Sequence, residues 1–196
     1  MIRARGLGRR YGDKVALAGV DLDVERGELL LVTGPNGSGK TTLLRLLVGL
    51  IAPTKGNLEV AADRPDIGFL AHEPLVYREL SPLENLDLYG RLYRIPERRE
   101  RIGMLLERFG LWDARRERTA ALSRGMLQRL ALCRTLLHEP QLVLLDEPFS
   151  ALDAAGVDLL LGEVSRRDRG RTIVISSHQP ERLGDRPTSR LSLAPA

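Results

Sequence analysis

The stretch Gly34-Pro35-Asn36-Gly37-Ser38-Gly39-Lys40-Thr41 decides how the fold of this chain is interpreted, because it matches the phosphate-loop pattern GxxxxGK[ST]. Its glycines let the backbone curl until successive N–H groups point at one anion, and a helix beginning near Lys40 adds the positive end of its dipole. Lys40 is expected to reach the β- and γ-phosphates of a nucleotide, and the Thr41 hydroxyl to bind Mg²⁺. The nucleotide-binding residues expected here are Gly34, Pro35, Asn36, Gly37, Ser38, Gly39, Lys40, Thr41 and Thr42.

The alternative interpretation of this stretch is a glycine-rich turn that happens to precede a helix. Since glycine makes up about 7% of an average protein, a chance match should occur in roughly one chain in a hundred of this length. A strand before the loop and a helix after it make a chance match rarer still. We therefore expect the chain to bind a nucleotide.

The segments around the loop alternate between strand and helix. Residues 28–34, ELLLVTG, contain a continuous apolar run that ends in glycine, as expected of a fully buried parallel strand. A helix is expected over residues 40–50, and further buried strands over IGFLA (67–71), QLVLLDE (141–147) and TIVISS (172–177). Residues up to about 32 divide into short strands at glycine-containing turns. The pattern predicts an α/β fold with a mainly parallel sheet and an N-terminal antiparallel β region.

Between residues 71 and about 139 the periodicity becomes that of helices. Ser81-Pro82-Leu83-Glu84 has the form of a capping box, with proline at the first helical position. Two later stretches repeat apolar residues at helical spacing, namely Ile102, Leu105, Leu106 and Phe109, and then Met126, Leu130, Cys133 and Leu137. We predict a single domain over 1–196, in which 1–70 and 140–196 form the nucleotide-binding core and 71–139 an inserted helical lobe. Little regular structure is expected after His178.

The composition excludes several classes of protein. A length of 196 residues suits one domain, and 43% hydrophobic residues suffice for a buried core, which excludes a disordered chain. The lone cysteine, Cys133, excludes a disulfide scaffold and a cysteine-based zinc site. No run reaches the roughly 18–20 apolar residues of a membrane span, and MIRARGLGRR lacks the apolar centre of a signal peptide. These features predict a soluble, cytoplasmic chain.

The basic charge balance leaves several partners open. Lys+Arg total 30 against 26 Asp+Glu, which gives a net charge of +4 and a pI of about 9.6. Nucleic acid, an anionic membrane surface or a merely arginine-rich composition would each fit this balance. Residues 91–118 hold nine arginines and five acidic residues, an excess equal to the net charge of the chain. A solvated helix face with i,i+4 ion pairs is the preferred explanation, and a surface facing anionic lipid headgroups is the alternative.

Two acidic residues and one histidine follow buried strands. Asp146 and Glu147 end the strand QLVLLDE at the carboxyl edge of the sheet, where α/β proteins bind ligands. Asp146 is expected to share Mg²⁺ with Thr41, and Glu147 to polarise the attacking water as a general base. His178, after TIVISS, can bridge the γ-phosphate and the water, although a lone histidine there is more typical of a surface. The expected catalytic residues are Glu147, His178 and Lys40.

The order of these motifs resembles that of the ATP-binding cassette (ABC) ATPases over almost the whole chain. The phosphate loop, the helical insertion, LSRGM, LVLLDEP, SALD and SSH follow one another as in that family. LSRGM resembles the family signature LSGGQ, although Arg124 stands where the family usually has glycine and Met126 where it usually has glutamine. The resemblance implies an ATP-hydrolysing protein with ATP and Mg²⁺ as cofactors. It also implies a head-to-tail homodimer in which Ser123, Arg124, Gly125 and Met126 act in trans on ATP held by the partner.

Three further positions take their expected roles from this resemblance. Tyr11 in RRYGDKVAL resembles the aromatic residue that stacks on adenine, with an ordinary strand-edge tyrosine as the alternative. Asp153 in SALD resembles the loop that crosses the dimer interface. His72 stands where the family has a glutamine, in the loop that lines the Mg²⁺ and couples the nucleotide state to the membrane partner.

Within the family, FLAHEP, ELSPLENLDLYGRLY and SSHQP on a short cassette resemble the ATP-binding subunit of the haem exporter of cytochrome c maturation. This implies a peripheral protein at the cytoplasmic face of the inner membrane, bound to integral transporter subunits and not to nucleic acid. No haem is expected on this chain itself, because it lacks a Cys-x-x-Cys-His run. The alternatives are the ATPase of a drug, lipid or polysaccharide exporter, a soluble cassette acting on ribosomes or DNA, and a catalytically idle regulatory cassette.

Overall fold

In the computed structural model, which describes residues 1–166 and 170–195, a sheet of five parallel strands stands at the centre. Its order is β5-β6-β7-β3-β8, and every neighbouring pair is parallel. The strands are β3 Leu29–Thr33, β5 Ile67–Leu70, β6 Leu142–Asp146, β7 Thr172–Ser176 and β8 Ser189–Ser192. The predicted α/β fold with a parallel sheet is confirmed.

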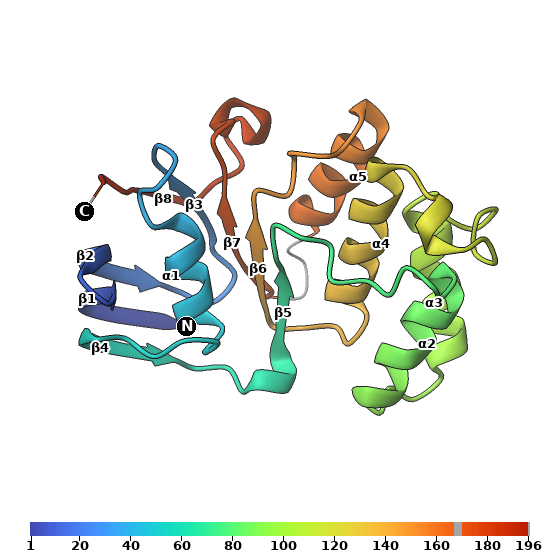
Figure 1. Ribbon diagram of the computed structural model, residues 1–196, viewed down its shortest axis with the longest axis horizontal. Helices are drawn as coiled ribbons and strands as arrows, with labels where there is room; N and C mark the ends of the chain where they lie inside the picture. The colour runs from blue at the N-terminus through green and yellow to red at the C-terminus, as the bar shows by residue number, and fades with distance from the viewer. Residues whose placement is uncertain (167–169, 196) are drawn as a thin grey trace.

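Both faces of the parallel sheet are buried, which explains why its inner strands are continuously apolar. Alternate side chains of β3 point to opposite faces of the sheet and pack in two different hydrophobic clusters. Leu29 and Leu31 pack with the helices on one side, whereas Leu30 and Val32 pack with helix α1 (Lys40–Leu47) and the N-terminal strands on the other. Figure 1 shows the resulting layers, from the N-terminal strands through α1 and the parallel sheet to the remaining helices.

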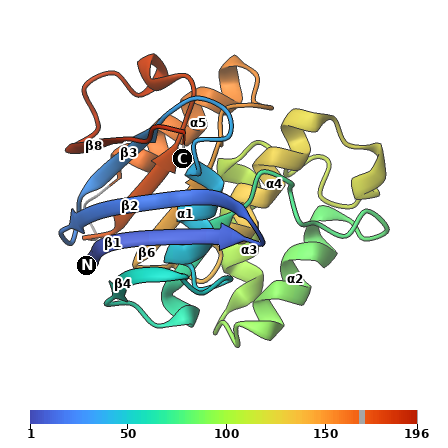
Figure 2. The same ribbon diagram turned by 60° about the vertical axis from the view of Figure 1, so that its left-hand side comes forward.

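The N-terminal strands form a separate antiparallel sheet in the order β2-β1-β4, seen in front in Figure 2. Its strands are β1 Ile2–Tyr11, β2 Lys14–Val24 and β4 Lys55–Val60. The predicted N-terminal antiparallel region is therefore confirmed, although its first two strands are long rather than short. Strand β4 was not predicted, because KGNLEV is largely exposed and has no buried alternation.

Three helices follow β5, as the periodicity predicts, at α2 Pro82–Leu92, α3 Arg98–Arg108 and α4 Arg124–Leu136. The capping box at the start of α2 is confirmed, since Ser81 Oγ accepts from Glu84 N–H at 3.3 Å and Glu84 Oε2 accepts from Ser81 N–H at 2.8 Å. The predicted apolar positions of α3 are fully buried. Short 3₁₀ helices occupy Arg64–Asp66 and Thr119–Ala121.

Helix α4 contacts both the other helices and the parallel sheet. Its N-terminal end carries the LSRGM stretch, while near its C-terminal end Arg134 and Thr135 donate hydrogen bonds to Phe69 O in β5. A side chain at Gly68 would lie 2.5 Å from Thr135 O, so glycine permits this close approach. Helix α4 therefore connects the signature stretch rigidly to the sheet.

The last third of the chain contains three elements that were not predicted, namely a helix, a 3₁₀ helix and an edge strand. Helix α5 (Ala154–Ser165) begins after Asp153, whose Oδ1 accepts from Gly156 N–H at 2.8 Å as an N-cap. The expectation of little structure after His178 was wrong, because residues Pro180–Leu183 form a 3₁₀ helix and β8 pairs with β3. The polar sequence SRLS of β8 suits the edge of a sheet and carries no apolar run. Within the described residues, no helix is both long and apolar enough to cross a bilayer.

Candidate functional site

The phosphate loop joins the end of β3 to the start of α1 and needs its glycines for geometric reasons. Gly34, Gly37 and Gly39 all have positive φ, at 148°, 83° and 94°. A side chain at Gly34 would lie 2.5 Å from Ser38 Oγ, and one at Gly39 would collide with Ala16 O. Ser38 is 1% exposed, and its hydroxyl has no partner among the described residues. A tightly curled loop with an unsatisfied buried hydroxyl fits a cradle for a polar ligand.

Lys40 is the buried cation of this loop. The residue is 7% exposed, and its Nζ donates to Gly34 O at 2.8 Å and Pro35 O at 3.3 Å. Nζ also lies 3.5 Å from Glu147 Oε1, which forms an ion pair. These contacts keep the ammonium group at the mouth of the loop, where it can bind an anion.

Thr41 and Asp146, the two residues predicted to share Mg²⁺, are in direct contact. Thr41 Oγ1 donates to Asp146 Oδ2 at 2.8 Å, and Ser176 Oγ donates to Asp146 Oδ1 at 2.7 Å. Asp146 is 1% exposed, so its carboxylate is oriented by these two bonds. A hydroxyl and a carboxylate are the hard oxygen ligands that Mg²⁺ prefers, and the donor set therefore fits that ion.

Glu147 occupies an unusual backbone conformation at the end of β6. Its φ is 48°, and its N–H is held by Ser176, at 3.2 Å from the carbonyl and 3.0 Å from Oγ. Its carboxylate Oε2 lies 2.7 Å from His178 Nδ1 and accepts from His178 N–H at 3.1 Å. The carboxyl ends of β6 and β7 thus bring the expected base and the expected histidine together, while Glu147 Oε1 faces Lys40. A left-handed non-glycine residue at such a position is typical of functional sites.

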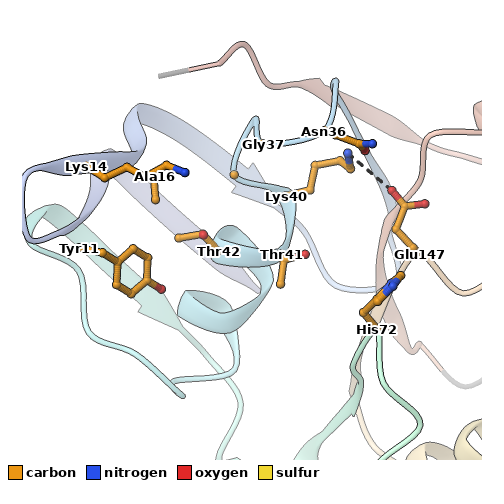
Figure 3. Close-up of a pocket in the computed structure, with 11 residues that line it drawn as sticks. Tyr11, Lys14, Ala16, Asn36, Gly37, Lys40, Thr41, Thr42, His72 and Glu147 are labelled. Carbon is orange, nitrogen blue, oxygen red and sulfur yellow. Dashed lines mark ion pairs between the residues drawn. The ribbon is translucent and has the colours of Figure 1, made fainter.

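A cavity of about 450 Å³ opens over these groups and has the size of a small-molecule site. Tyr11 and Thr42 line one end of it, and Lys40, Thr41 and Glu147 the other, as Figure 3 shows. The complete lining is Tyr11, Lys14, Ala16, Asn36, Gly37, Gly39, Lys40, Thr41, Thr42, His72 and Glu147. Lys14 and Ala16 were not predicted, because only the antiparallel pairing of β1 and β2 brings them beside the loop.

The signature stretch lies at a second cavity of about 550 Å³. Ser123 caps α4, its Oγ accepting from Met126 N–H at 3.2 Å, and a Cβ at Gly125 would stand 3.4 Å from Ala151 O. Arg124 and Asp153 line this cavity together with His72, which also lines the first cavity. Neither Ser123 nor Asp153 is among the residues described as lining the first cavity.

Two residues that support the site carried no signal in the sequence. Ser176 ends β7 as an ordinary strand residue, yet it positions both Asp146 and Glu147. Buried Gln128 in α4 donates to Pro148 O at 3.3 Å and so holds the signature helix against the segment after Glu147. Pairing across the sheet and packing of α4 create these roles, and no local motif marks them.

Cys133, one of the positions predicted to form the apolar stripe of a helix, is a packing residue. It is completely buried in α4, and burial raises the pKa of its thiol. Only the thiolate form is strongly nucleophilic or metal-binding, so this cysteine is chemically quiet.

Known proteins share both the sequence and the fold of this chain. Residues 17–150 match the ABC transporter family. The chain is 39% identical to the daunorubicin resistance ATP-binding protein DrrA3 of Streptomyces coeruleorubidus, over 100% of this chain and 65% of that protein. It is 36% identical to the uncharacterized ABC transporter ATP-binding protein YxlF of Bacillus subtilis, over 91% of this chain and 62% of that protein. The chain thus spans less than two thirds of the length of these two relatives.

Another relative is covered more completely. The ABC transporter ATP-binding protein NatA of Bacillus subtilis is 34% identical over 93% of this chain and 81% of that protein.

Solved structures agree with this relationship. The dimeric structure of MJ0796, a bacterial ABC transporter cassette, superposes with a TM-score of 0.89 at 28% identity, over 100% of this chain and 95% of that one. A dimeric post-hydrolysis state of MJ0796 bound to ADP and Pi gives a TM-score of 0.85 at 28% identity, over 98% and 94%. On its sequence and its fold, the chain belongs to the ABC transporter family.

Proposed function

We propose that this chain is the ATP-hydrolysing, nucleotide-binding subunit of a membrane transporter. The observation that carries the proposal is the convergence of Lys40, Thr41 and Glu147 on one cavity, with Asp146 bonded to Thr41. These residues come from the phosphate loop and from the end of β6, separate parts of the chain that meet at the carboxyl edge of the parallel sheet. That edge is where nucleotides bind in α/β proteins of this kind.

Each side chain has a role that its surroundings support. Lys40 and the loop N–H groups would bind the β- and γ-phosphates, and Tyr11 would stack on the base at the far end of the cavity. Thr41 and Asp146 would hold Mg²⁺, which when bound neutralises charge on the phosphate oxygens. Glu147 would accept the proton of the attacking water, and His178 would orient that carboxylate.

The proposed active form is a homodimer. The N-terminal end of α4, capped by Ser123, carries N–H groups and the Arg124 side chain suited to an anion. A partner subunit would supply that anion as the γ-phosphate on its own phosphate loop, with Asp153 at the interface. The dimeric structures of MJ0796 support this arrangement for a related cassette.

We further propose that integral membrane subunits bind next to His72, which places the protein peripherally at the cytoplasmic face of the membrane. The loop after β5 exposes two large apolar side chains, Leu75 at 51% and Tyr77 at 50%. Exposed apolar residues grouped in one loop are typical of a protein interface. Because His72 lines both cavities, movement of this loop would change the lining of the proposed nucleotide site.

For the cargo, we propose haem export or haem delivery in cytochrome c maturation, with no haem and no nucleic acid bound by this chain. The support is FLAHEP, ELSPLENLDLYGRLY and SSHQP in the sequence. The relatives named above, and others such as an aliphatic sulfonates import ATP-binding protein of Rhodococcus jostii, carry names with different cargoes or none. The cargo therefore needs its own experiment.

Two experiments test the function and the cargo separately. Release of phosphate from Mg²⁺-ATP by the purified chain, lost in Glu147→Gln, tests the ATPase; a wild-type chain without turnover, alone or with its co-purified membrane subunits, would contradict it. Deletion of the protein, followed by staining of covalent haem on c-type cytochromes, tests the cargo. Normal cytochromes would overturn the haem proposal and leave the ATPase proposal untouched.

A further inference from the structure

Gln179, the residue after His178, makes a contact that the proposed hydrolysis does not by itself require. Its side-chain Nε2 lies 3.1 Å from His178 Nε2, while the other ring nitrogen, Nδ1, lies 2.7 Å from Glu147 Oε2. The imidazole is therefore held through both of its nitrogens. One partner is an amide and the other a carboxylate.

The two partners together select one protonation pattern of the ring. An amide nitrogen can only donate, so His178 Nε2 has to accept and carries no hydrogen. An ionised carboxylate can only accept, so Nδ1 carries the hydrogen and donates to Glu147. With the amide nitrogen facing the ring, the two contacts at Gln179 and Glu147 fit the neutral Nδ1–H tautomer, whereas a reversed amide would accept from an Nε2–H group.

The buried position of the amide oxygen argues that this contact is more than packing, although the residue as a whole is only half-buried. Gln179 Oε1 is buried and has no partner among the described residues. Turning the amide over would bury the NH₂ group there instead, so either orientation leaves a polar group unpaired. An apolar side chain would fill the space without that penalty, and the gain from glutamine therefore lies in its bond to the histidine.

The backbone around Gln179 limits where its amide can go. Its N–H donates to Ser177 Oγ at 3.0 Å, and Pro180 begins the next 3₁₀ helix. Since proline restricts the residue before it, the side chain starts from a fixed position beside the ring. Ser177 itself is buried and held to β3 by its N–H bond to Val32 O.

We propose that Gln179 is a positioning residue that fixes His178 in its Nδ1–H tautomer and so aims the ring at Glu147. The consequence for turnover rests on the proposed ATPase function, whereas the tautomer itself does not. Without the amide, the Nε2–H tautomer competes, and a ring in that form presents a lone pair instead of a hydrogen to the Glu147 carboxylate. Glu147 would then lose the donor that orients it.

The test compares Gln179→Met with Glu181→Met, which introduces the same side chain at an exposed position of the following 3₁₀ helix. Two-bond ¹H–¹⁵N spectra of the full chain without added nucleotide, at a pH where imidazole is neutral, distinguish the two tautomers. The His178 signals are assigned by comparison with His178→Phe. Wild type and Glu181→Met should show Nδ1–H at His178, and Gln179→Met should show a larger share of Nε2–H, with Glu147 still favouring the Nδ1–H form.

A second readout is steady-state ATP hydrolysis. Gln179→Met should lower kcat about tenfold with the KM for ATP within about twofold, because the contact that orients His178 is lost and no phosphate ligand is changed. A tautomer ratio in Gln179→Met equal to that of wild type would overturn the proposal, as would a changed ratio with unchanged kcat. If wild type hydrolyses ATP while Gln179→Met keeps the wild-type spectrum, the positioning role fails and the ATPase function stands.

Discussion

Glu147 Oε1 lies 3.5 Å from Lys40 Nζ, so the expected general base and the expected phosphate ligand form an ion pair across the cavity. Both side chains are largely buried, with 13% and 8% of their surfaces exposed. A γ-phosphate that reaches Lys40 competes with this carboxylate for the same ammonium group. In the proposed function, phosphate binding and release of the base would therefore be coupled by this one contact.

Glu147→Gln tests this coupling. The substitution removes the base and also the negative charge beside Lys40, so ATP should bind as tightly as in wild type or more tightly, while kcat falls by about 10²–10⁴-fold. Equilibrium binding of labelled ATP and phosphate release measure the two effects. Glu107→Gln, at an exposed position of α3, is the matched control. Turnover within about threefold of wild type in Glu147→Gln would remove this residue from the role of base.

Lys40→Ala should weaken ATP binding, whereas Glu147→Gln should retain it. Because Lys40 is the buried cation of the loop, its loss leaves the β- and γ-phosphates without their charge partner and leaves Glu147 unpaired. The affinity for ATP should fall at least about 100-fold, as for loss of a buried charge-assisted contact. Isothermal titration with ATP measures the change, and Lys55→Ala, on exposed β4, serves as the control. Wild-type affinity in Lys40→Ala would contradict the assignment of the phosphate loop.

The central sheet and the chemistry at its edge could be predicted from the sequence, because short continuous segments of the chain carry the signal for both. The apolar runs of β3, β6 and β7 and the loop 34–41 need no knowledge of neighbours. Strands β4 and β8 could not be predicted in the same way, since they are edge strands with polar sequences that pair only because β1 and β3 lie beside them.

The site shows the same division between local motifs and tertiary pairing. Ser176 acquires its role from Asp146, 30 residues away in the chain, and the role proposed for Gln179 depends on how the loop after β7 turns, which no spacing rule encodes. In the sequence, His72 stands out only as a departure from a family pattern, whereas in the fold it lines both cavities. Residues that position other residues are thus the part of a site hardest to find in sequence.

Arg124 provides a test of the dimer. Its side chain is exposed at the start of α4, beside Arg78 and His72 in the second cavity, where a partner's phosphate would add the missing negative charge. Arg124→Gly restores the residue usual for the family, so the dimer should still form, but with about 3- to 10-fold weaker ATP-dependent association and a smaller dependence on salt. Sedimentation of the Glu147→Gln protein with ATP, with and without the second change, measures this. Equal association at every salt concentration would show that the arginine is a bystander.

Asn85 provides a test of how the loop after β5 is held. This residue is 1% exposed, accepts from Tyr77 N–H at 2.8 Å and donates to Tyr77 O, at 2.9 Å, and to Thr119 Oγ1, at 3.2 Å. Asn85→Ala leaves these buried groups unpaired and should lower the free energy of unfolding by about 2–4 kcal/mol. Urea denaturation followed by circular dichroism measures it. Asn57→Ala, at an exposed position of β4, should change stability by less than about 0.5 kcal/mol.

The buried ring of His138 should make the stability of the folded chain depend on pH. Its ring stacks on Tyr93 with centroids 4.1 Å apart, and burial lowers the pKa of the imidazole from its ordinary value of 6.5. The unfolded chain therefore takes up a proton at a higher pH than the folded chain does. The contribution of His138 to stability is complete above about pH 6.5 and is lost as the pH falls below that value.

His138→Phe keeps an aromatic ring beside Tyr93 and removes the titrating group. Compared with wild type, the variant should lose less stability between about pH 6.5 and pH 5, while the two curves run parallel above pH 7. Urea unfolding at a series of pH values gives the difference curve. Tyr93→Phe, which retains both the stack and His138, should keep the wild-type slope. Identical slopes in wild type and His138→Phe would show that the buried ring takes up its proton as readily in the folded chain as in the unfolded one.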